Sequence, residues 1–357
     1  MSSDLGNARL IANNFRFSGD YHPRNQADSF DRQPQADAYF SHNSMEITPQ
    51  VTPALAGSIV KVCDRLSIPR SRVKAYVYSS AELQAYCVSD GGEHCFIRLS
   101  SGLIDLLEPE ELEFVAGHEL GHFLLSHSIS ANHSDIDALE TKILQRAQEV
   151  SADRIGLVAC ESLDVSIKAL MKTVSGLNSE HLRFDVGEFI GQIRKIKGED
   201  FPGQGGSSHP SMLVRCRALL WFSLSSSSKG YINSQDRPED LDKLDNQVRK
   251  DLNDYVDGSV QKEITILKDS VSMWLAAKSI VSDGKFIKPE QDRFSRMFGL
   301  DNLKKLKDFL SHLDSDSAIS EVDERLESAK SDLFKALPHS FSKEYSQLES
   351  LIIKSFA

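Results

Sequence analysis

The chain of 357 residues lacks any long apolar run, any Cys-x-x-Cys pair and any excess of positive charge. A membrane-spanning helix needs about 20 consecutive apolar residues, and the longest candidate here, Ala218–Leu224, is far shorter. The 41 basic side chains are outnumbered by 52 acidic ones, which gives a net charge of −11. This balance argues against nucleic acid or an anionic membrane as the partner.

A disulfide framework and a secretory signal are also lacking. The five cysteines are odd in number and scattered along the chain, so they predict free thiols in a reducing compartment. Residues 1–11 contain one positive charge and no apolar core segment, which is not the pattern of a signal peptide. We therefore expect a soluble cytoplasmic protein with no integral membrane segment.

What is present divides into four parts by composition. Residues 1–48 form a polar N-terminal arm, and residues 49–224 form a domain with helical periodicity and two alternating strands. Residues 225–237 form a serine-rich linker, and residues 238–357 form a charged helical domain. The arm is expected to be loosely structured. The predicted fold class is α+β: a mainly helical domain with a small β-sheet, followed by an all-α helical bundle.

The stretch His118-Glu119-Leu-Gly-His122 carries the strongest chemical signal. Two histidines four residues apart share one face of a helix, where they can bind one metal ion. Glu119 follows the first histidine, so it can act as general base toward a water on an open coordination position of zinc. The ordinary alternative is a helix with two unrelated surface histidines.

The third ligand separates the classes of metallopeptidase. A metzincin needs glycine and histidine where this chain has Leu125 and Ser128. The remaining option is a carboxylate from a second helix, and Glu149 and Asp153 lie four apart on one helix face. One of the two can bind metal while the other orients a ligand histidine.

Three elements in a fixed order carry a resemblance to a known family. They are the helix motif with a further histidine at His127, the Glu-x-x-Ala-Asp stretch of Glu149–Asp153, and His209-Pro210 followed by Arg215. With these, residues 50–222 resemble the gluzincin peptidases that include HtpX and the CAAX prenyl endopeptidases, metallopeptidase family forty-eight. The order and spacing of the elements make the resemblance specific, and it covers about half of the chain.

The resemblance implies one zinc ion per chain, bound by His118, His122 and Glu149. It also implies Glu119 as the general base and Asp153 as the carboxylate that orients a ligand histidine. His209 corresponds to a catalytic histidine that stabilises the oxyanion. As a fourth ligand it would instead close the site and make the enzyme latent.

Substrate binding is implied for the strand that precedes the motif, formed by Cys95, Phe96, Ile97, Arg98 and Leu99. In gluzincins the corresponding edge strand holds an extended peptide by backbone pairing. Members of the family tend to carry an Asn-Ala-Phe-like segment before it, and the nearest match is Gln84-Ala85-Tyr86. His127 is expected to be a structural or rim residue, because five helical positions rotate it away from His122.

The family's membrane-embedded members have transmembrane segments that this chain lacks. We therefore expect a soluble endopeptidase that acts on a protein or an unfolded segment, by metal-activated water with Glu119 as general base. The alternative is a zinc-stabilised binding or sensor protein with vestigial or no catalysis. Glu119 argues against it, since a structural site needs no base, whereas ligation by four protein groups would favour it.

The C-terminal part contains an apolar helix, Asp283-Gly284 and a Pro289-Glu290 helix start. This pattern resembles the TerB-like helical domain, in which Asp283 and Glu290 would bind metal. A plain helix-turn-helix accounts for the same residues, because Asp-Gly ends one helix and Pro-Glu begins the next. We expect this domain to be an interaction module for a regulatory protein.

Overall fold

The computed structural model describes residues 4–20, 36–90, 93–127, 138–192, 211–225, 239–282 and 286–356. The chain forms two compact units. Unit 1 comprises Met1–His133 and Lys142–Asp257, and unit 2 comprises Ser134–Thr141 and Gly258–Ala357. In the described residues, no helix has the length and apolar character needed to span a bilayer.

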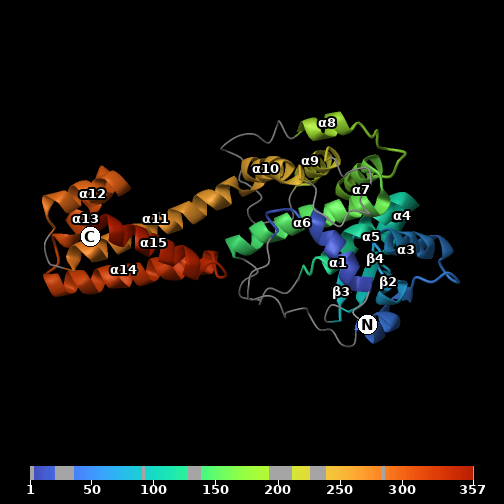
Figure 1. Ribbon diagram of the computed structural model, residues 1–357, viewed down its shortest axis with the longest axis horizontal. Coiled ribbons are helices and arrows are strands. Elements are labelled where there is room, and N and C mark those ends of the chain that lie inside the picture. The colour runs from blue at the N-terminus through green and yellow to red at the C-terminus, as the bar shows by residue number, and fades with distance from the viewer. Residues whose placement is uncertain are drawn as a thin grey trace. The chain divides into compact units, whose positions relative to one another are not determined.

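Unit 1 combines helices with a small sheet, as the sequence predicted (Figure 1). Its helices are α1 (Asp4–Phe15), α2 (Ala36–Asn43), α3 (Pro53–Arg65), α4 (Ser101–Leu106), α5 (Pro109–Leu124), α6 (Leu139–Cys160, of which residues 139–141 belong to unit 2), α7 (Leu163–Ser175), α8 (Val186–Gly191), α9 (Met212–Ser223) and α10 (Leu241–Leu252), with the short 3-10 helix η1 (Arg70–Arg72) and the short π-helix η4 (Asn253–Asp257). Its strands are β1 (Met45–Glu46), β2 (Val73–Tyr78), β3 (Ala85–Ser89) and β4 (Cys95–Ser100).

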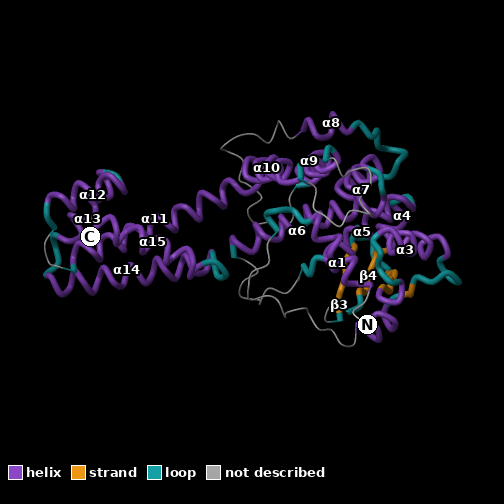
Figure 2. Tube along the Cα trace, viewed as in Figure 1, coloured by secondary structure: helices purple, strands orange, loops and turns teal. Residues whose placement is uncertain are grey.

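The four strands, orange in Figure 2, form one mixed sheet in the order β1-β2-β4-β3. β4 runs parallel to β2, with Ala75 opposite Ile97, and antiparallel to β3, with Cys87 opposite Ile97. Residues on both faces of β4 are buried, which is typical of a central strand. This confirms the α+β class.

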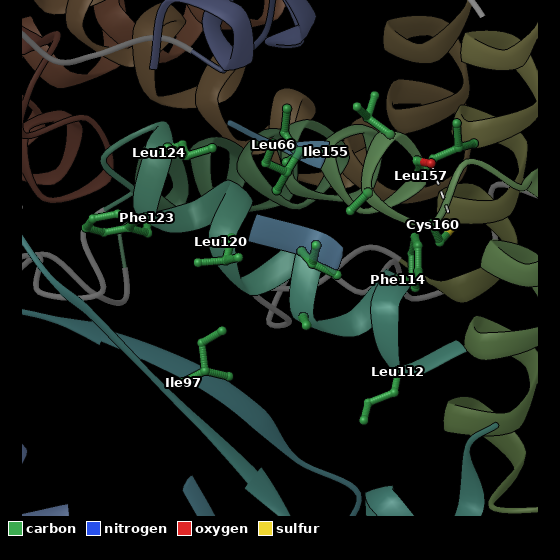
Figure 3. Close-up of a cluster of buried hydrophobic side chains, with 14 of the residues drawn as sticks. Leu66, Ile97, Leu112, Phe114, Leu120, Phe123, Leu124, Ile155, Leu157 and Cys160 are labelled. Atoms are coloured by element: carbon green, nitrogen blue, oxygen red, sulfur yellow. Dashed lines mark hydrogen bonds between the residues drawn. The ribbon is translucent and has the colours of Figure 1, made fainter. Parts of the chain in front are cut away.

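Helix α5 lies at the centre of unit 1 and contacts α1, α3, α7, β3 and β4. It begins with Pro109 after a capping box in which Glu111 accepts a hydrogen bond from the Glu108 backbone N–H. Most of its residues are buried, including Glu111, Glu113, His118 and Glu119 as well as apolar side chains, because other elements surround the helix. Figure 3 shows α5 between Ile97 of β4 and Ile155 of α6.

The N-terminal part is more ordered than its composition suggested. Residues 4–15 form helix α1, and the buried face of this helix consists of Leu5, Ala8, Ala12 and Phe15. The spacing of these four residues is helical. Two of them are alanines, so the apolar pattern is weak in a sequence with three asparagines, and the helix is recognised only from its packing against α5.

Unit 2 is all-helical in its described residues. Its helices are α11 (Gly258–Val281), α12 (Lys288–Phe298), α13 (Leu300–Leu310), α14 (Ser315–Ala336) and α15 (Phe341–Phe356). Helix α11 packs against α14 and α15, and the buried face of α14 includes Val322, Leu326 and Leu333 at helical spacing. Asp283 lies outside the described residues, while the Glu290 carboxylate accepts a hydrogen bond from the Ile287 backbone N–H at the start of α12.

Candidate metal centre

Three side chains from two helices converge in unit 1. The His118 and His122 Nε2 atoms lie 3.1 Å apart on α5. The Glu149 carboxylate of α6 approaches them, with Oε2 3.6 Å from His118 Nε2 and Oε1 3.3 Å from His122 Nε2. Among the described residues this is the one His/Cys/Asp/Glu group whose potential ligand atoms all lie close enough to hold an ion, within 4.8 Å.

Glycines at the helix crossing permit this convergence. A Cβ on Gly117 would lie 2.3 Å from the Ala159 Cβ, and one on Gly121 would lie 3.1 Å from the Ala152 Cα. The first distance leaves no room for a side chain, and the second is tight enough that α6 would have to yield by a few tenths of an ångström. The absence of side chains therefore brings the backbone of α6 near the face of α5 that carries both histidines.

His118 is oriented by a buried carboxylate. Its Nδ1 atom lies 2.9 Å from Asp153 Oδ1. A carboxylate so placed accepts a hydrogen bond from the Nδ1–H group, which leaves the Nε2 atom directed toward Glu149. The spacing in the sequence left open which carboxylate faces the metal and which orients a histidine. In the structure Glu149 lies beside both Nε2 atoms, and Asp153 lies behind the His118 ring.

Arg215 of α9 contacts both of these carboxylates. Its Nε and Nη2 atoms lie 2.8 Å and 2.5 Å from the two Asp153 oxygens, and its Nη1 atom lies 3.3 Å from Glu149 Oε2. Burial alone would raise the pKa of Asp153, but the guanidinium outweighs it and lowers that pKa. The sequence pattern included Arg215 without a role, and the structure shows that its charge keeps Asp153 ionised.

His127 lies closer to the centre than an unbroken helix would allow. Helix α5 ends at Leu124, and Ser126 takes a left-handed conformation with φ of 56°. The His127 N–H then bonds to the His122 carbonyl at 2.9 Å, which is the backbone pattern of a Schellman cap. The chain therefore turns back, and His127 Nδ1 lies 2.8 Å from His122 Nδ1.

The protonation of these rings follows from their surroundings. Burial disfavours the charged ring of His122, but the hydrogen bond and charge of the Glu149 carboxylate, aided by Glu119, raise the pKa of His122 to about 9. Without a metal ion its Nε2 atom therefore carries a proton, which a bound cation would displace. Burial lowers the pKa of His127 to about 4, against the opposing attraction of Asp20. His127 is therefore neutral at neutral pH, with one ring nitrogen as donor and the other as acceptor.

A cleft of about 550 Å³ opens beside the three converging groups. Glu119 lines it together with His118 and Glu149, and the Glu119 residue is 8% exposed. The rest of the lining is largely apolar and includes Leu103, Phe114, Val115, Leu170 and Met212. His209 lies outside the described residues.

The expectation that Cys95–Leu99 pairs with a substrate is wrong. β4 is hydrogen-bonded on one side to β2 and on the other to β3, so its backbone has no free edge. Among the described residues, β3 is the outer strand on this side of the sheet, and Gln84, Ala85 and Tyr86 line the cleft. Strand order follows from long-range pairing, which the alternation of side chains did not reveal.

Comparison with known proteins assigns this arrangement to a family. The model of peptidase family M48 matches residues 49–141 and 132–221. Through residues 49–221, the chain belongs to peptidase family M48. The M48 region holds His118, Glu119, His122, Glu149 and the remaining described cleft residues.

Three curated relatives match parts of the chain. The plastoglobule-localized metallopeptidase 48 of Arabidopsis thaliana is 26% identical over 217 residues, 53% of this chain and 62% of that protein. The metalloprotease YcaL of Escherichia coli is 41% identical over 54 residues, 15% of this chain and 20% of that protein. The protease HtpX homolog of Nostoc punctiforme is 28% identical over 83 residues, 23% of this chain and 28% of that protein.

These matches cover less than two thirds of the length of each relative. No solved structure matches the chain. The M48 family is zinc-dependent, and the donor set of this chain fits that metal. Two imidazoles and one carboxylate are the ligands of many catalytic zinc sites, and the Nδ1 partners of both histidines leave the two Nε2 atoms, 3.1 Å apart, as the nitrogens available to a metal ion.

Proposed function

We propose that the chain is a zinc-dependent endopeptidase that hydrolyses peptide bonds in protein substrates, with one zinc ion per chain. The observation that carries the proposal is the convergence of His118, His122 and Glu149 beside Glu119 at a cleft. Membership of family M48 supports the same activity. A purely structural metal site would leave Glu119 without a chemical reason to line that cleft.

The roles of the residues follow from their positions. His118, His122 and Glu149 would hold the zinc ion. Zinc bound there supplies Lewis-acid polarisation of the scissile carbonyl and activates water as the nucleophile. Glu119 takes the proton from the attacking water and delivers it to the leaving amine.

Strand β3 is the element we propose for holding the substrate. It lies at the sheet edge, and Gln84, Ala85 and Tyr86 at its start line the cleft. An extended peptide pairs with such an edge through backbone groups, with little selection among side chains. The apolar lining provided by Leu103 and Leu170 favours an apolar side chain next to the cleaved bond.

Substitution of the general base tests the proposal. Glu119→Gln is expected to bind the same amount of zinc as the wild type, one ion per chain by mass spectrometry, and to cleave casein about 100- to 10,000-fold more slowly. Glu110→Gln removes an exposed carboxylate from the same helix and is the matched control, which should match the wild type in both measurements.

Each other outcome has a distinct meaning. Absence of zinc from the wild type contradicts the metal centre. Zinc in all variants without cleavage by any favours the latent enzyme or the binding protein. His209→Ala, assayed alongside, is expected to lower turnover while zinc content stays the same, as required of a group that stabilises the oxyanion.

For unit 2 we propose an interaction module for a regulatory protein, in line with its resemblance to TerB-like domains. All described groups of the metal centre lie in unit 1. Glu290 already has a partner at the start of its own helix. More than one zinc ion per chain would reopen a metal role for Asp283 and Glu290, and calorimetric unfolding tests the separation of the units.

A further inference from the structure

We infer that Asp20 is a positioning residue of the metal centre and acts on His122 through His127. The inference rests on the proposed zinc-binding function and adds to it a residue from outside the region that matches the M48 family. That region begins at residue 49. The metal centre of this chain would then depend on the N-terminal segment Arg16–Asp20.

The three residues form an unbroken chain of hydrogen bonds. His122 Nδ1 lies 2.8 Å from His127 Nδ1, and His127 Nε2 lies 2.8 Å from Asp20 Oδ2. The carboxylate accepts from the His127 Nε2–H, so the Nδ1 atom of His127 is the acceptor for the His122 Nδ1–H. With Nδ1–H donating to His127, Nε2 is the nitrogen of His122 left to bind a metal ion, and it faces Glu149 Oε1 at 3.3 Å.

The hydrogen bond between His127 and Asp20 is enclosed, so water cannot take the place of either group. The Asp20 side chain is fully buried, and that of His127 is 2% exposed. A hydrogen bond in such surroundings is lost outright when one partner is removed. His118 has an equivalent partner in Asp153, but that carboxylate lies within the M48 region, whereas the carboxylate behind His122 comes from residue 20.

The segment that carries Asp20 is held from several sides. The Arg16 Nη2 atom donates to the Leu125 carbonyl at the end of α5, at 2.7 Å. The Phe17 N–H donates to Ser151 Oγ at 3.0 Å, and the Ser18 N–H donates to Asp245 Oδ2 at 2.9 Å.

Phe17 is 1% exposed and packs against Ala147 and Val150 of α6. These contacts join the segment to both helices that carry the converging ligands. α1, which leads into the segment, lies beside α5 (Figure 1).

A residue that hydrogen-bonds to a metal ligand and orients it has a measurable effect on metal affinity. Loss of such a partner commonly weakens metal binding by about 10- to 100-fold, because the ligand ring is no longer held in the binding tautomer and direction. Asp20→Asn keeps the shape of the side chain but removes the charge that attracts the His127 donor. We therefore expect a weaker zinc site in a folded protein.

The test compares Asp20→Asn with Phe17→Leu in the full chain. Phe17→Leu loosens the same segment by reducing its core packing, but leaves the hydrogen-bond chain from Asp20 to His122 in place. For each protein, zinc affinity is measured by chelator competition, the visible spectrum by cobalt substitution, and the stability of the metal-free form by urea unfolding.

Asp20→Asn is expected to bind zinc about 10- to 100-fold more weakly than the wild type and to alter the cobalt spectrum. Phe17→Leu is expected to lose stability without either change. Wild-type zinc affinity in Asp20→Asn overturns the inference, as does an equal loss of affinity in Phe17→Leu at matched metal-free stability. If the wild type itself binds no zinc, the proposed function fails instead.

Discussion

At the scale of single residues, Arg215 balances the charge of the metal centre. Its guanidinium lies within 3.3 Å of oxygens from both Asp153 and Glu149, and all three residues are buried. Removal of one member of such a group leaves uncompensated buried charge. Asp153 would then lose the partner that keeps its pKa low, and Glu149 would lose the Arg215 Nη1 atom that lies 3.3 Å from its Oε2.

Arg215→Met is therefore expected to lower the free energy of unfolding of the metal-free protein by about 3–5 kcal/mol. Zinc should restore part of this loss, because a dication beside Glu149 replaces the missing positive charge. Urea unfolding with a chelator and with zinc measures both effects.

Arg217→Met is the matched control. Arg217 lies on the same helix and pairs with Asp251, but its side chain is 27% exposed and Trp221 also donates to Asp251. A loss of about 1 kcal/mol or less is expected there. Equal losses in the two variants would show that Arg215 acts as an ordinary ion pair.

At the scale of elements, the crossing of α5 and α6 determines where the ligands meet. The histidine pair lies on α5 and Glu149 lies on α6, so the distance between the helices decides whether three donors can reach one ion. Gly117 and Gly121 permit the close approach, because a Cβ at Gly117 would collide with α6 and one at Gly121 would press tightly against it. Gly117 leaves no room for even one methyl group.

Gly117→Ala is expected to cost about 1–3 kcal/mol of unfolding free energy through overpacking. It should also weaken zinc binding, since α6 must move away from the neighbouring His118. Gly57→Ala in α3 is the control, because no atom lies within 4 Å of the position of its Cβ. It should be neutral or stabilising by up to about 1 kcal/mol.

The two variants are compared by urea unfolding and by chelator competition. Unchanged zinc affinity in Gly117→Ala would mean that the centre tolerates a wider separation of the helices. Destabilisation of Gly57→Ala would mean that α3 is sensitive to substitution for reasons other than contact.

At the scale of the whole molecule, the chain divides into two compact units, and the candidate zinc ligands all belong to unit 1. Each unit has its own buried apolar residues, such as Leu120 in α5 and Val322 in α14. Within unit 2, the buried Glu140 carboxylate accepts hydrogen bonds from the His339 and Ser340 N–H groups. Separate cores favour separate unfolding transitions.

Scanning calorimetry is expected to show two transitions, of which zinc shifts only one. A ligand that binds the folded form alone stabilises it by about 2.7 kcal/mol at 100 times its dissociation constant. Zinc binding should stabilise unit 1 alone, because the candidate ligands all lie there. The unfolding transition of unit 2 should therefore stay at the same temperature when a chelator replaces zinc. A shift of both transitions, or a single cooperative one, would contradict independent units.

Local periodicity in the sequence was sufficient to predict several features of the fold and of the metal centre. The α+β class, the helix that carries His118 and His122, and the shared face of Glu149 and Asp153 all follow from repeats of 3.6 or 2 residues. Such repeats involve neighbours along the chain, so they persist in almost any fold. The convergence of the two histidines with Glu149 was implied by the family resemblance, because the spacing alone left open whether Glu149 or Asp153 lies beside them.

Only the tertiary structure decided which distant groups complete the centre. Asp20 reaches His127 across 107 positions of the chain, and Arg215 reaches Asp153 across 62. The central position of β4 was likewise hidden, because strand order depends on which edges pair. Sequence alone determined the motif and its helices, since those are local; packing over long separations selected the residues that hold the motif in place.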